Sequence, residues 1–351
     1  MKWLKWAVLF AALAMQATES QAQKIDPFGG QVPGRETWFG TFSIIAFDPA
    51  TNQFGVGVQS RAFNAGEAVP WAEAGVGAVA TQASTNRTYG PKAMALLKQG
   101  MSPADIIKKI TDEDPARAGR QVAIIDTKGR MACYTGKNVI DRDNNPKDYV
   151  HFGDYSGCIT IEGKNYSVQG NTLASEDVLK AMAAAFEQTK GEMGNRLLAA
   201  LDAGQAKGGD SRGMQSGGLL VVQPIGDTNR TSDRVLEINV DDSEDPFKEM
   251  HRILNVQQSG PHNTKALQLA GQGKIAEAIA ELKIAREMNP KNEQINYNLA
   301  VNYARSGDFK NSLLTLTAAI KKQPRLKMNV ADEPAFDKMR TMAEFKKLVQ
   351  K

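Results

Sequence analysis

Two short runs of apolar, β-branched and aromatic residues open the regular part of the chain. Residues 41–47 (TFSIIAF) and 54–58 (FGVGV) are typical of β-strands. Residues 48–52 (DPATN) lie between them and have the composition of a turn, because Pro presets φ and Asp and Asn bond their own backbone. The pattern therefore predicts a β-hairpin that begins at Thr41.

Runs typical of strands and of helices then follow one another up to residue 240. Ser102 followed by Pro103 is a helix start, with Ser as the cap and Pro in the first turn. The order is strands, two helices, strands, two helices and strands, which predicts an α+β fold with helices and sheets in separate layers. Strands are expected at 75–82, 121–126, 130–134, 166–169, 219–223 and 235–240, and helices at 92–99, 104–111, 176–188 and 195–204.

The last ninety residues are helical and repetitive. Residues 265–290 and 299–324 align on a spacing of 34, which is the period of tetratricopeptide repeats, although an unrelated pair of helical hairpins is the alternative. Residues 332–349 resemble a terminal capping helix. The acidic and polar residues 241–260 mark the expected boundary between a domain at 41–255 and an array at 262–349. Two repeats bury little surface alone, so the array is expected to pack on the first domain or on a protein partner.

The N-terminal segment has the three parts of a secretory signal. Residues 1–22 combine two early lysines, a short apolar run and a small-x-small site, so cleavage is expected before Gln23. An uncleaved anchor is the alternative, but the apolar run is shorter than the roughly 20 residues of a membrane span. Residues 23–40 are predicted to be a linker or pro-segment. The protein is therefore expected in the periplasm or outside the cell, with no membrane span after cleavage.

Composition excludes several classes of function. The formal net charge is only +4, without a basic stripe interleaved with aromatics, so no nucleic-acid partner is expected. The three histidines form no spacing typical of a metal site, and neither a metal nor another cofactor is expected. Cys133 and Cys158 can either pair in an oxidising compartment or remain as buried thiols.

Thr41, directly after Gly40, is the first catalytic candidate. In N-terminal-nucleophile hydrolases a self-cleavage exposes the α-amine of such a Thr, and the amine then acts as base for the side-chain hydroxyl. This chemistry needs no histidine, which fits a chain that contains three. The alternative is that Thr41 is simply a residue with high β-propensity.

The chain resembles a bacterial family known only as a domain of unknown function, number ten twenty-eight. The resemblance rests on TFSI with DP at 41–49, GVGAVATQ at 75–82, QGN with LA at 169–174, and GGD, RG and QS at 208–216, and it covers about residues 41–255. It implies a four-layer αββα sandwich of the N-terminal-nucleophile hydrolase type. The family has no established activity, although links to cell-wall modules suggest a role on peptidoglycan.

The proteasome β-subunit, which is related in fold, differs at the positions that assist its nucleophile. Its second strand ends in Asp-Ser-Arg, whereas here the sequence is Gln59-Ser60-Arg61, and residues 75–82 contain no Lys. The resemblance still makes Ser60 and Arg61 candidates for substrate binding. Thr41 lies behind 18 residues of the mature chain, so a second cut would be required.

A polar set on glycine-rich segments is the second candidate site. Asp210 and Arg212 are flanked by glycines and are expected to hold the amine and the carboxylate of an amino-acid-like group, although a structural Asp–Arg loop pair is the alternative. Asn171 is expected to donate to an oxyanion. Ser216 and Asn86 complete the expected binding residues, Asn86 before a helix start that either binds an anion or is only capped.

The sequence thus predicts an amidohydrolase or peptidase with Thr41, Asn171 and Asp210 as catalytic residues. Its expected ligand is a small amide or a cell-envelope peptide. The alternative is a non-catalytic binding module that uses the repeats to dock a protein or peptide partner. A homo-oligomer is left open.

Overall fold

The computed structural model describes residues 40–139, 160–226 and 231–350, and the fold given below is that of these residues. Its larger sheet has six antiparallel strands in the order β10-β9-β2-β1-β8-β7. β1 lies in the interior of this sheet, paired with β2 and with β8, and the predicted hairpin is confirmed. The strands are β1 (Thr41–Asp48), β2 (Gln53–Ser60), β7 (Thr160–Gly163), β8 (Tyr166–Asn171), β9 (Ser216–Val222) and β10 (Arg234–Val240).

The smaller sheet has four antiparallel strands in sequence order. They are β3 (Pro70–Glu73), β4 (Gly77–Ala83), β5 (Arg120–Asp126) and β6 (Met131–Thr135). The sequence pattern predicted β4, β5 and β6 but neither β3 nor β7. Both of these strands are four residues long, which is too short for an alternating pattern to distinguish them from a loop.

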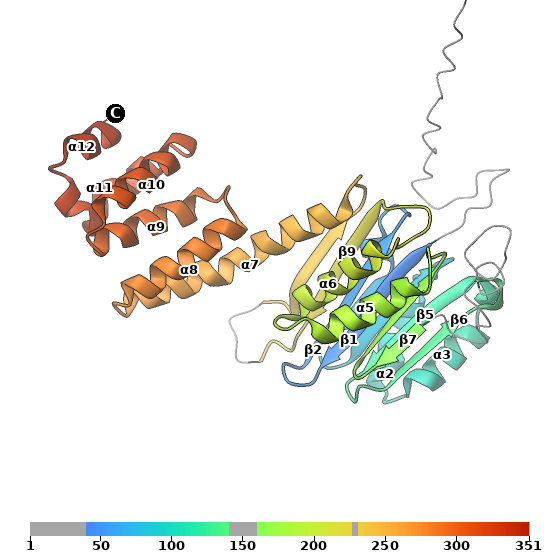
Figure 1. Cartoon of the computed structure of the whole chain (residues 1–351). Helices are drawn as coiled ribbons and strands as arrows, with labels where there is room; N and C mark the ends of the chain where they lie inside the picture. The colour runs from blue at the N-terminus through green and yellow to red at the C-terminus, as the bar shows by residue number, and fades with distance from the viewer. Residues whose placement is uncertain (1–39, 140–159, 227–230, 351) are drawn as a thin grey trace, which may run out of the picture. The chain divides into compact units, whose positions relative to one another are not determined.

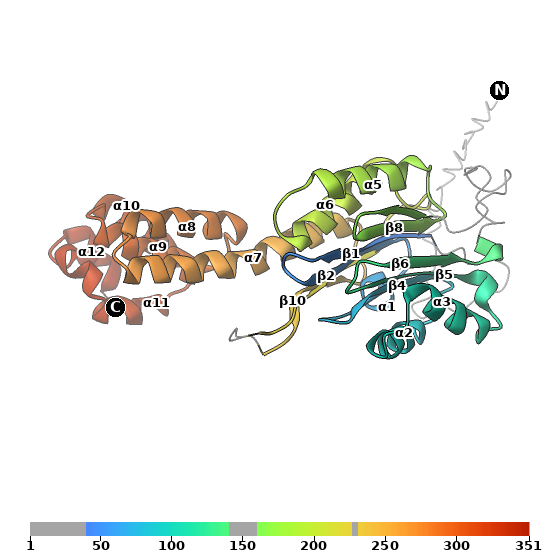
Figure 2. The same cartoon turned by 90° about the horizontal axis from the view of Figure 1, so that it is seen from below.

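Each sheet carries a pair of helices on its outer face, as Figures 1 and 2 show. α5 (Asp177–Gln188) and α6 (Met193–Ala206) cover the larger sheet, and α2 (Tyr89–Lys98) and α3 (Pro103–Asp112) cover the smaller one. The cap predicted for α3 is confirmed, because Ser102 Oγ accepts from the Asp105 N–H at 3.3 Å. The short α1 (Ala65–Ala68) and a 3₁₀ turn (Arg117–Gly119) lie in the connections.

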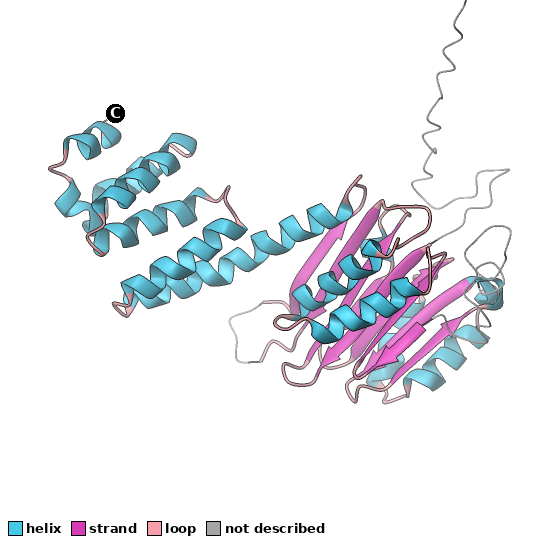
Figure 3. Cartoon of the chain, in the orientation of Figure 1, coloured by secondary structure: helices cyan, strands magenta, loops and turns pink. Residues whose placement is uncertain are grey.

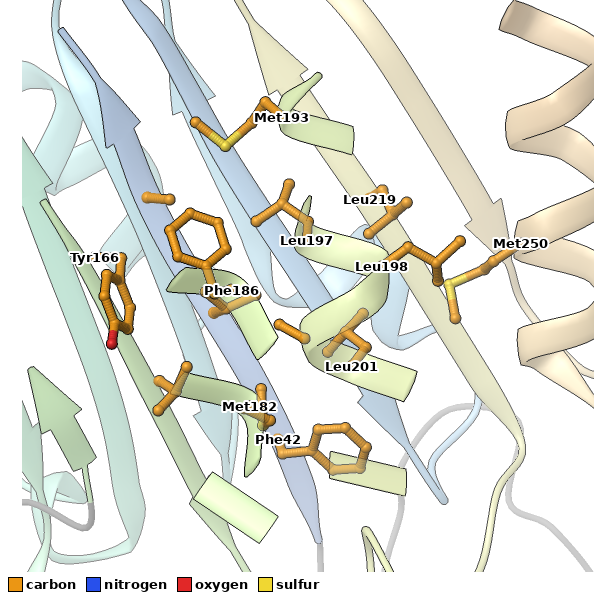
Figure 4. Close-up of a cluster of buried hydrophobic side chains, with 14 of the residues drawn as sticks. Phe42, Tyr166, Met182, Phe186, Met193, Leu197, Leu198, Leu201, Leu219 and Met250 are labelled. Carbon is orange, nitrogen blue, oxygen red and sulfur yellow. The ribbon is translucent and has the colours of Figure 1, made fainter. Parts of the chain in front are cut away.

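Alternate residues of β1 enter two different cores. Phe42 and Ile44 face the helices, whereas Ile45 and Phe47 pack between the two sheets. Figure 4 shows the side chains of the helix-facing core, with the Phe42 ring close to Met182 of α5. Burial of a phenylalanine such as Phe42 contributes about 3 kcal/mol. This packing fixes the position of the neighbouring Thr41 on the opposite face of the strand.

The C-terminal part is helical, as Figure 3 shows by its colouring. α7 is one helix over Pro246–Gly271, so it runs through residues 246–260, where the polar composition predicted a boundary. Its first turn is capped by Asp245, and its buried residues serve two cores, Met250 with the sheets and Ala266 with the following helices. The polar composition therefore reflects its exposed face. After it come α8 (Ile275–Met288), α9 (Glu293–Arg305), α10 (Phe309–Lys322), α11 (Leu326–Asp332), a 3₁₀ helix (Pro334–Met339) and α12 (Ala343–Val349).

Some of the sequence predictions concern residues that the structure does not describe. The signal and the pro-segment, apart from Gly40, lie outside the described residues, as does Cys158. Cys133 in β6 is disulfide-bonded. In the described part of the chain, no helix has both the length and the apolar character that a membrane crossing requires.

Candidate functional site

The space between the two sheets is apolar at one end and polar at the other. On β1 the residues that face the smaller sheet change from Ile45 and Phe47 to Ser43 and Thr41 toward the start of the strand. The ends of the neighbouring strands follow the same division. The buried polar residues at this end are Thr41, Ser43, Ser60, Gln82, Gln121, Thr135, Ser167, Gln169 and Asn171.

Side-chain hydrogen bonds join this polar layer across the two sheets. Gln169 Nε2 donates to Ser43 Oγ at 2.6 Å, and Ser43 Oγ donates to Gln82 Oε1 at 2.7 Å. Gln82 Nε2 in turn donates to Gln121 Oε1 at 2.7 Å. A buried polar group without a partner costs about 1–3 kcal/mol, so this pairing is what allows a polar layer inside a sandwich. This hydrogen-bonded layer lies beside Thr41.

The carbonyl oxygen of Gly40 accepts hydrogen bonds from three side chains of the site. Thr41 Oγ1 donates to it at 2.6 Å, Ser60 Oγ at 2.5 Å and Arg212 Nη2 at 2.9 Å. The two hydroxyl oxygens are also 3.0 Å apart, and Ser60 Oγ accepts from the Ala62 N–H at 3.1 Å. Two hydroxyl protons serve three contacts. Thr41 can donate its proton either to the carbonyl or to Ser60 Oγ, and Ser60 can accept that proton while it donates its own to the carbonyl.

Asp210 holds Arg212 in place. Its buried carboxylate accepts from the Arg212 backbone N–H and Nε at 3.0 Å each, and from Nη2 at 2.7 Å. A fourth bond comes from the Arg61 N–H at 3.0 Å. Gly208 and Gly209 precede Asp210 with φ of 103° and 53°, a backbone region that favours glycine. The predicted Asp–Arg loop pair is thus formed, and it lies against the peptide bond that precedes Thr41.

Arg61 and Ser216 have supporting roles. Arg61 Nη1 donates to Gln215 Oε1 at 2.8 Å, and Gln215 Nε2 donates to Asp242 Oδ1 at 3.1 Å. Ser216 Oγ donates to the Ala62 carbonyl at 2.6 Å and accepts from the Ala65 N–H at 2.9 Å. Both residues therefore fix the loop that follows Ser60.

Asn171 lies opposite Thr41 on the neighbouring strand and is fully buried. Its Nδ2 donates to Gln121 Oε1 at 2.9 Å, so it belongs to the polar layer. Gln121 Nε2 donates to Thr135 Oγ1 at 3.0 Å and to the Gly170 carbonyl at 2.9 Å. Ser60 and Arg212 donate to the Gly40 carbonyl, and the oxyanion role expected of Asn171 stays a prediction.

Asn86 belongs to a different cluster, which is centred on Asp114. Asp114 Oδ2 accepts from Asn86 Nδ2 at 3.1 Å, Tyr89 OH at 2.9 Å and Arg120 Nε at 2.9 Å. Burial alone would raise the pKa of Asp114, but the bonds from Arg120, the Ala116 N–H, Asn86 and Tyr89 outweigh it and hold the pKa well below its usual range. Burial, and then the bond to Asp114, raises the pKa of Tyr89. The cluster fixes the start of α2.

Within the described ranges, no three His, Cys, Asp or Glu side chains gather as they would around a metal ion. The site around Thr41 offers two hydroxyls, a guanidinium, a carboxylate and carboxamides. Sequence reasoning did not identify Gln82, Gln121 and Gln215 as parts of the site. The sequence did carry one signal for this layer. Residues 167–171 have a polar side chain at every second position, and such residues share one face of a strand.

Comparisons place these features among known proteins. A model of the family of unknown function DUF1028 matches residues 41–250, more than half of the chain. The crystal structure of a DUF1028 protein from Silicibacter pomeroyi is similar, with a TM-score of 0.51 and 26% identity over 61% of this chain and 88% of that one. No curated protein matches the sequence.

Proposed function

Since the chain belongs to the DUF1028 family of unknown function, we propose that it is an exported amidohydrolase or peptidase of the N-terminal-nucleophile type. In this proposal the chain cuts itself between Gly40 and Thr41, and Thr41 then becomes the nucleophile for other amides. The observation that carries the proposal is the Gly40 carbonyl, whose oxygen accepts from Thr41, Ser60 and Arg212 at 2.6, 2.5 and 2.9 Å.

These contacts suit the first chemical step. Thr41 Oγ1 attacks the Gly40 carbonyl carbon, and negative charge develops on the oxygen that Arg212 and Ser60 already contact. Preorganised donors at such an oxygen lower the barrier more than mobile water does. The guanidinium is held by the Asp210 carboxylate, so it needs no reorganisation as the charge develops.

The atoms of the proposed cleavage balance without a co-reactant other than water. The Gly40–Thr41 C–N bond breaks, the Thr41 nitrogen gains the proton that leaves the hydroxyl, and an ester joins Gly40 to Thr41 Oγ1. Ser60 Oγ, 3.0 Å from Thr41 Oγ1, relays this proton. Water then hydrolyses the ester, releasing a Gly40 carboxylate and a Thr41 with a free α-amine. That amine has an ordinary pKa of about 8 and serves as the base in later turnovers.

The fold supports the same proposal. Two antiparallel sheets with a helix pair outside each have the layer order of an αββα sandwich. The carboxylate and lysine that assist the proteasome Thr are missing at the corresponding positions. Here the Asp210–Arg212 pair, which reaches the site from the loop before β9, supplies the charge instead. The substrate class in this proposal is a small amide or a peptide of the cell envelope.

For the C-terminal helices we propose a short tetratricopeptide array that docks a protein partner. The 34-residue spacing places Gly273 and Gly307 at equivalent turns, with φ of 78° and 82°. Helix α7 carries residues of both the sheet core and the first repeat, so the array continues directly from the first domain.

The experiment that tests the proposed function measures cleavage of the Gly40–Thr41 bond directly. The chain beginning at Gln23 is purified and incubated at neutral pH, and its intact mass is recorded over time. Loss of residues 23–40 is expected for the natural chain and for Thr41→Ser, and no loss for Thr41→Ala. Thr51→Ala, at an exposed turn, is the matched control and is expected to cut normally. Cutting in Thr41→Ala, or none in the natural chain, contradicts the proposal.

A further inference from the structure

The uncut chain shows what kind of acyl group the site accepts, an inference that rests on the proposed function. During self-cleavage the acyl group of Gly40 becomes an ester on Thr41 Oγ1. During turnover the acyl group of a substrate becomes an ester on the same atom. The surroundings of Gly40 are therefore the surroundings of the substrate's acyl carbon and of the carbon next to it.

No side chain fits beside Gly40 in the L configuration. A Cβ added to Gly40 would lie 2.5 Å from Asp210 Oδ1, 2.7 Å from Oδ2 and 2.7 Å from Cγ. Carbon atoms that do not bond pack at about 3.5–4.0 Å from their neighbours, so this overlap is severe. The two carboxylate oxygens and the carbon between them all lie in the path of a methyl group.

Asp210 has little freedom to move aside. The residue is 1% exposed, and its carboxylate accepts four hydrogen bonds from Arg61 and Arg212. Its backbone is bridged to Leu173, and the following turn is closed by a bond from the Gly213 N–H to the Asp210 carbonyl. Displacement of the carboxylate would also release Arg212 from the carbonyl that it polarises. A side chain next to the acyl carbon therefore disturbs binding and chemistry together.

We infer that the processed protein is specific for glycyl amides, that is, for amides whose acyl group carries no L side chain on its α-carbon. Asp210 is the specificity-determining residue, because its carboxylate occupies the place of the first side-chain carbon. The selection concerns the acyl side of the bond. Residues on the amine side leave with the product and do not meet this carboxylate.

Two pairs of compounds that differ by one methyl group test the inference. The protein is first shown by mass to begin at Thr41, and its hydrolysis of acetyl-glycyl-aminomethylcoumarin and acetyl-L-alanyl-aminomethylcoumarin is compared. The second pair consists of the boronic acids that correspond to acetyl-glycine and acetyl-L-alanine, which form a tetrahedral adduct on the Thr hydroxyl without turnover. Their dissociation constants are measured by titration calorimetry.

Within each pair, the glycine compound is expected to be hydrolysed or bound at least about tenfold better, which corresponds to the cost of overpacking by one methyl group. The boronates decide the matter if neither coumarin amide is cleaved. Equal values, a preference for the alanine compound, or no binding of either boronate to the processed protein overturns the inference and leaves self-cleavage intact. A chain that never cuts removes the proposed function, and the inference with it.

Discussion

Asp210 and Arg212, two residues apart on one loop, are joined by three hydrogen bonds of 2.7–3.0 Å, and Arg212 Nη2 also donates to the Gly40 carbonyl at 2.9 Å. The carboxylate thus aims the guanidinium at the bond before Thr41. A fork-shaped donor makes such a pair directional as well as charged.

Replacement of Arg212 by Lys is expected to slow self-cleavage about 100-fold, by the loss of one preorganised donor to the developing oxyanion. An ammonium cannot bond both oxygens of Asp210 and the Gly40 carbonyl in the same geometry. The cleavage rate is measured by intact mass. Arg252→Lys, on an exposed arginine paired with Glu249, is the control and is expected to cut at the natural rate. A normal rate in Arg212→Lys would show that the guanidinium has no role.

Gly40→Ala is expected to fold and to cut at least about tenfold more slowly, because the new methyl group meets the Asp210 carboxylate. Circular dichroism checks the fold and mass spectrometry the cut. Gly260→Ala is the matched control, since a Cβ at that position of α7 has nothing within 4 Å. Equal cleavage rates in the two variants would mean that the Asp210 carboxylate moves aside to accommodate the methyl group.

The variants Ser60→Ala and Ser216→Ala distinguish a role in cleavage from a role in stability. Ser60 and Ser216 are paired residues on neighbouring strands, and both side chains are fully buried. Ser60→Ala removes the proton relay and is expected to slow the cut by about 10²-fold or more. Ser216→Ala removes a bond that holds the loop after Ser60 and is expected to lower the free energy of unfolding by about 1–2 kcal/mol with little change in cutting. A slow cut in Ser216→Ala, together with a normal rate in Ser60→Ala, would contradict the assignment of the proton relay to Ser60.

Gln121 is expected to be the most sensitive position of the polar layer. It accepts from Gln82 and Asn171 and donates to Thr135 and Gly170, so Gln121→Leu removes four buried hydrogen bonds at once. The expected loss in the free energy of unfolding is about 3 kcal/mol, measured by urea denaturation. Gln53→Leu, at the partly exposed start of β2, is expected to lose far less. Similar losses in both variants would deny the layer a structural role.

Asp114 gives a prediction for pH. Its folded pKa is lower than the unfolded value of about 3.9, so its stabilising contribution is fully present above that pH and is lost as the pH falls through the folded pKa. Asp114→Asn is therefore expected to lower the free energy of unfolding by about 3 kcal/mol at neutral pH and by progressively less in acid.

Denaturation at several pH values measures this difference for Asp114→Asn. Asp112→Asn is the control, because Asp112 is exposed and forms an ion pair with Lys108 on the same helix face. A difference between natural chain and Asp114→Asn that stays constant with pH would contradict the assigned role.

The hairpin at 41–58 and the capped helix after Ser102 were both accessible from the sequence. Each depends on residues that are close together in the chain, such as the turn at 48–52. The partners of Thr41 were only partly accessible. Arg212 reaches Gly40 across 172 positions, and such a contact follows from the order of strands in the sheet.

The course of α7 was not predictable for a related reason. Its residues 255–260 are mostly polar because this stretch of the helix is mostly exposed, and composition alone does not distinguish an exposed stretch of helix from a linker. The buried glutamines escaped notice because glutamine is usually a surface residue. Long-range hydrogen bonds, such as the one between Gln82 and Gln121, 39 positions apart, make the burial of these side chains possible.

The mass of the exported protein tests the central claim most directly. The full chain is expressed in a bacterium, recovered from the periplasm or medium without incubation, and weighed intact. A protein that begins at Thr41 is the predicted result, with Thr41→Ala beginning at Gln23. A natural chain that begins at Gln23, with no fraction beginning at Thr41, would contradict the account.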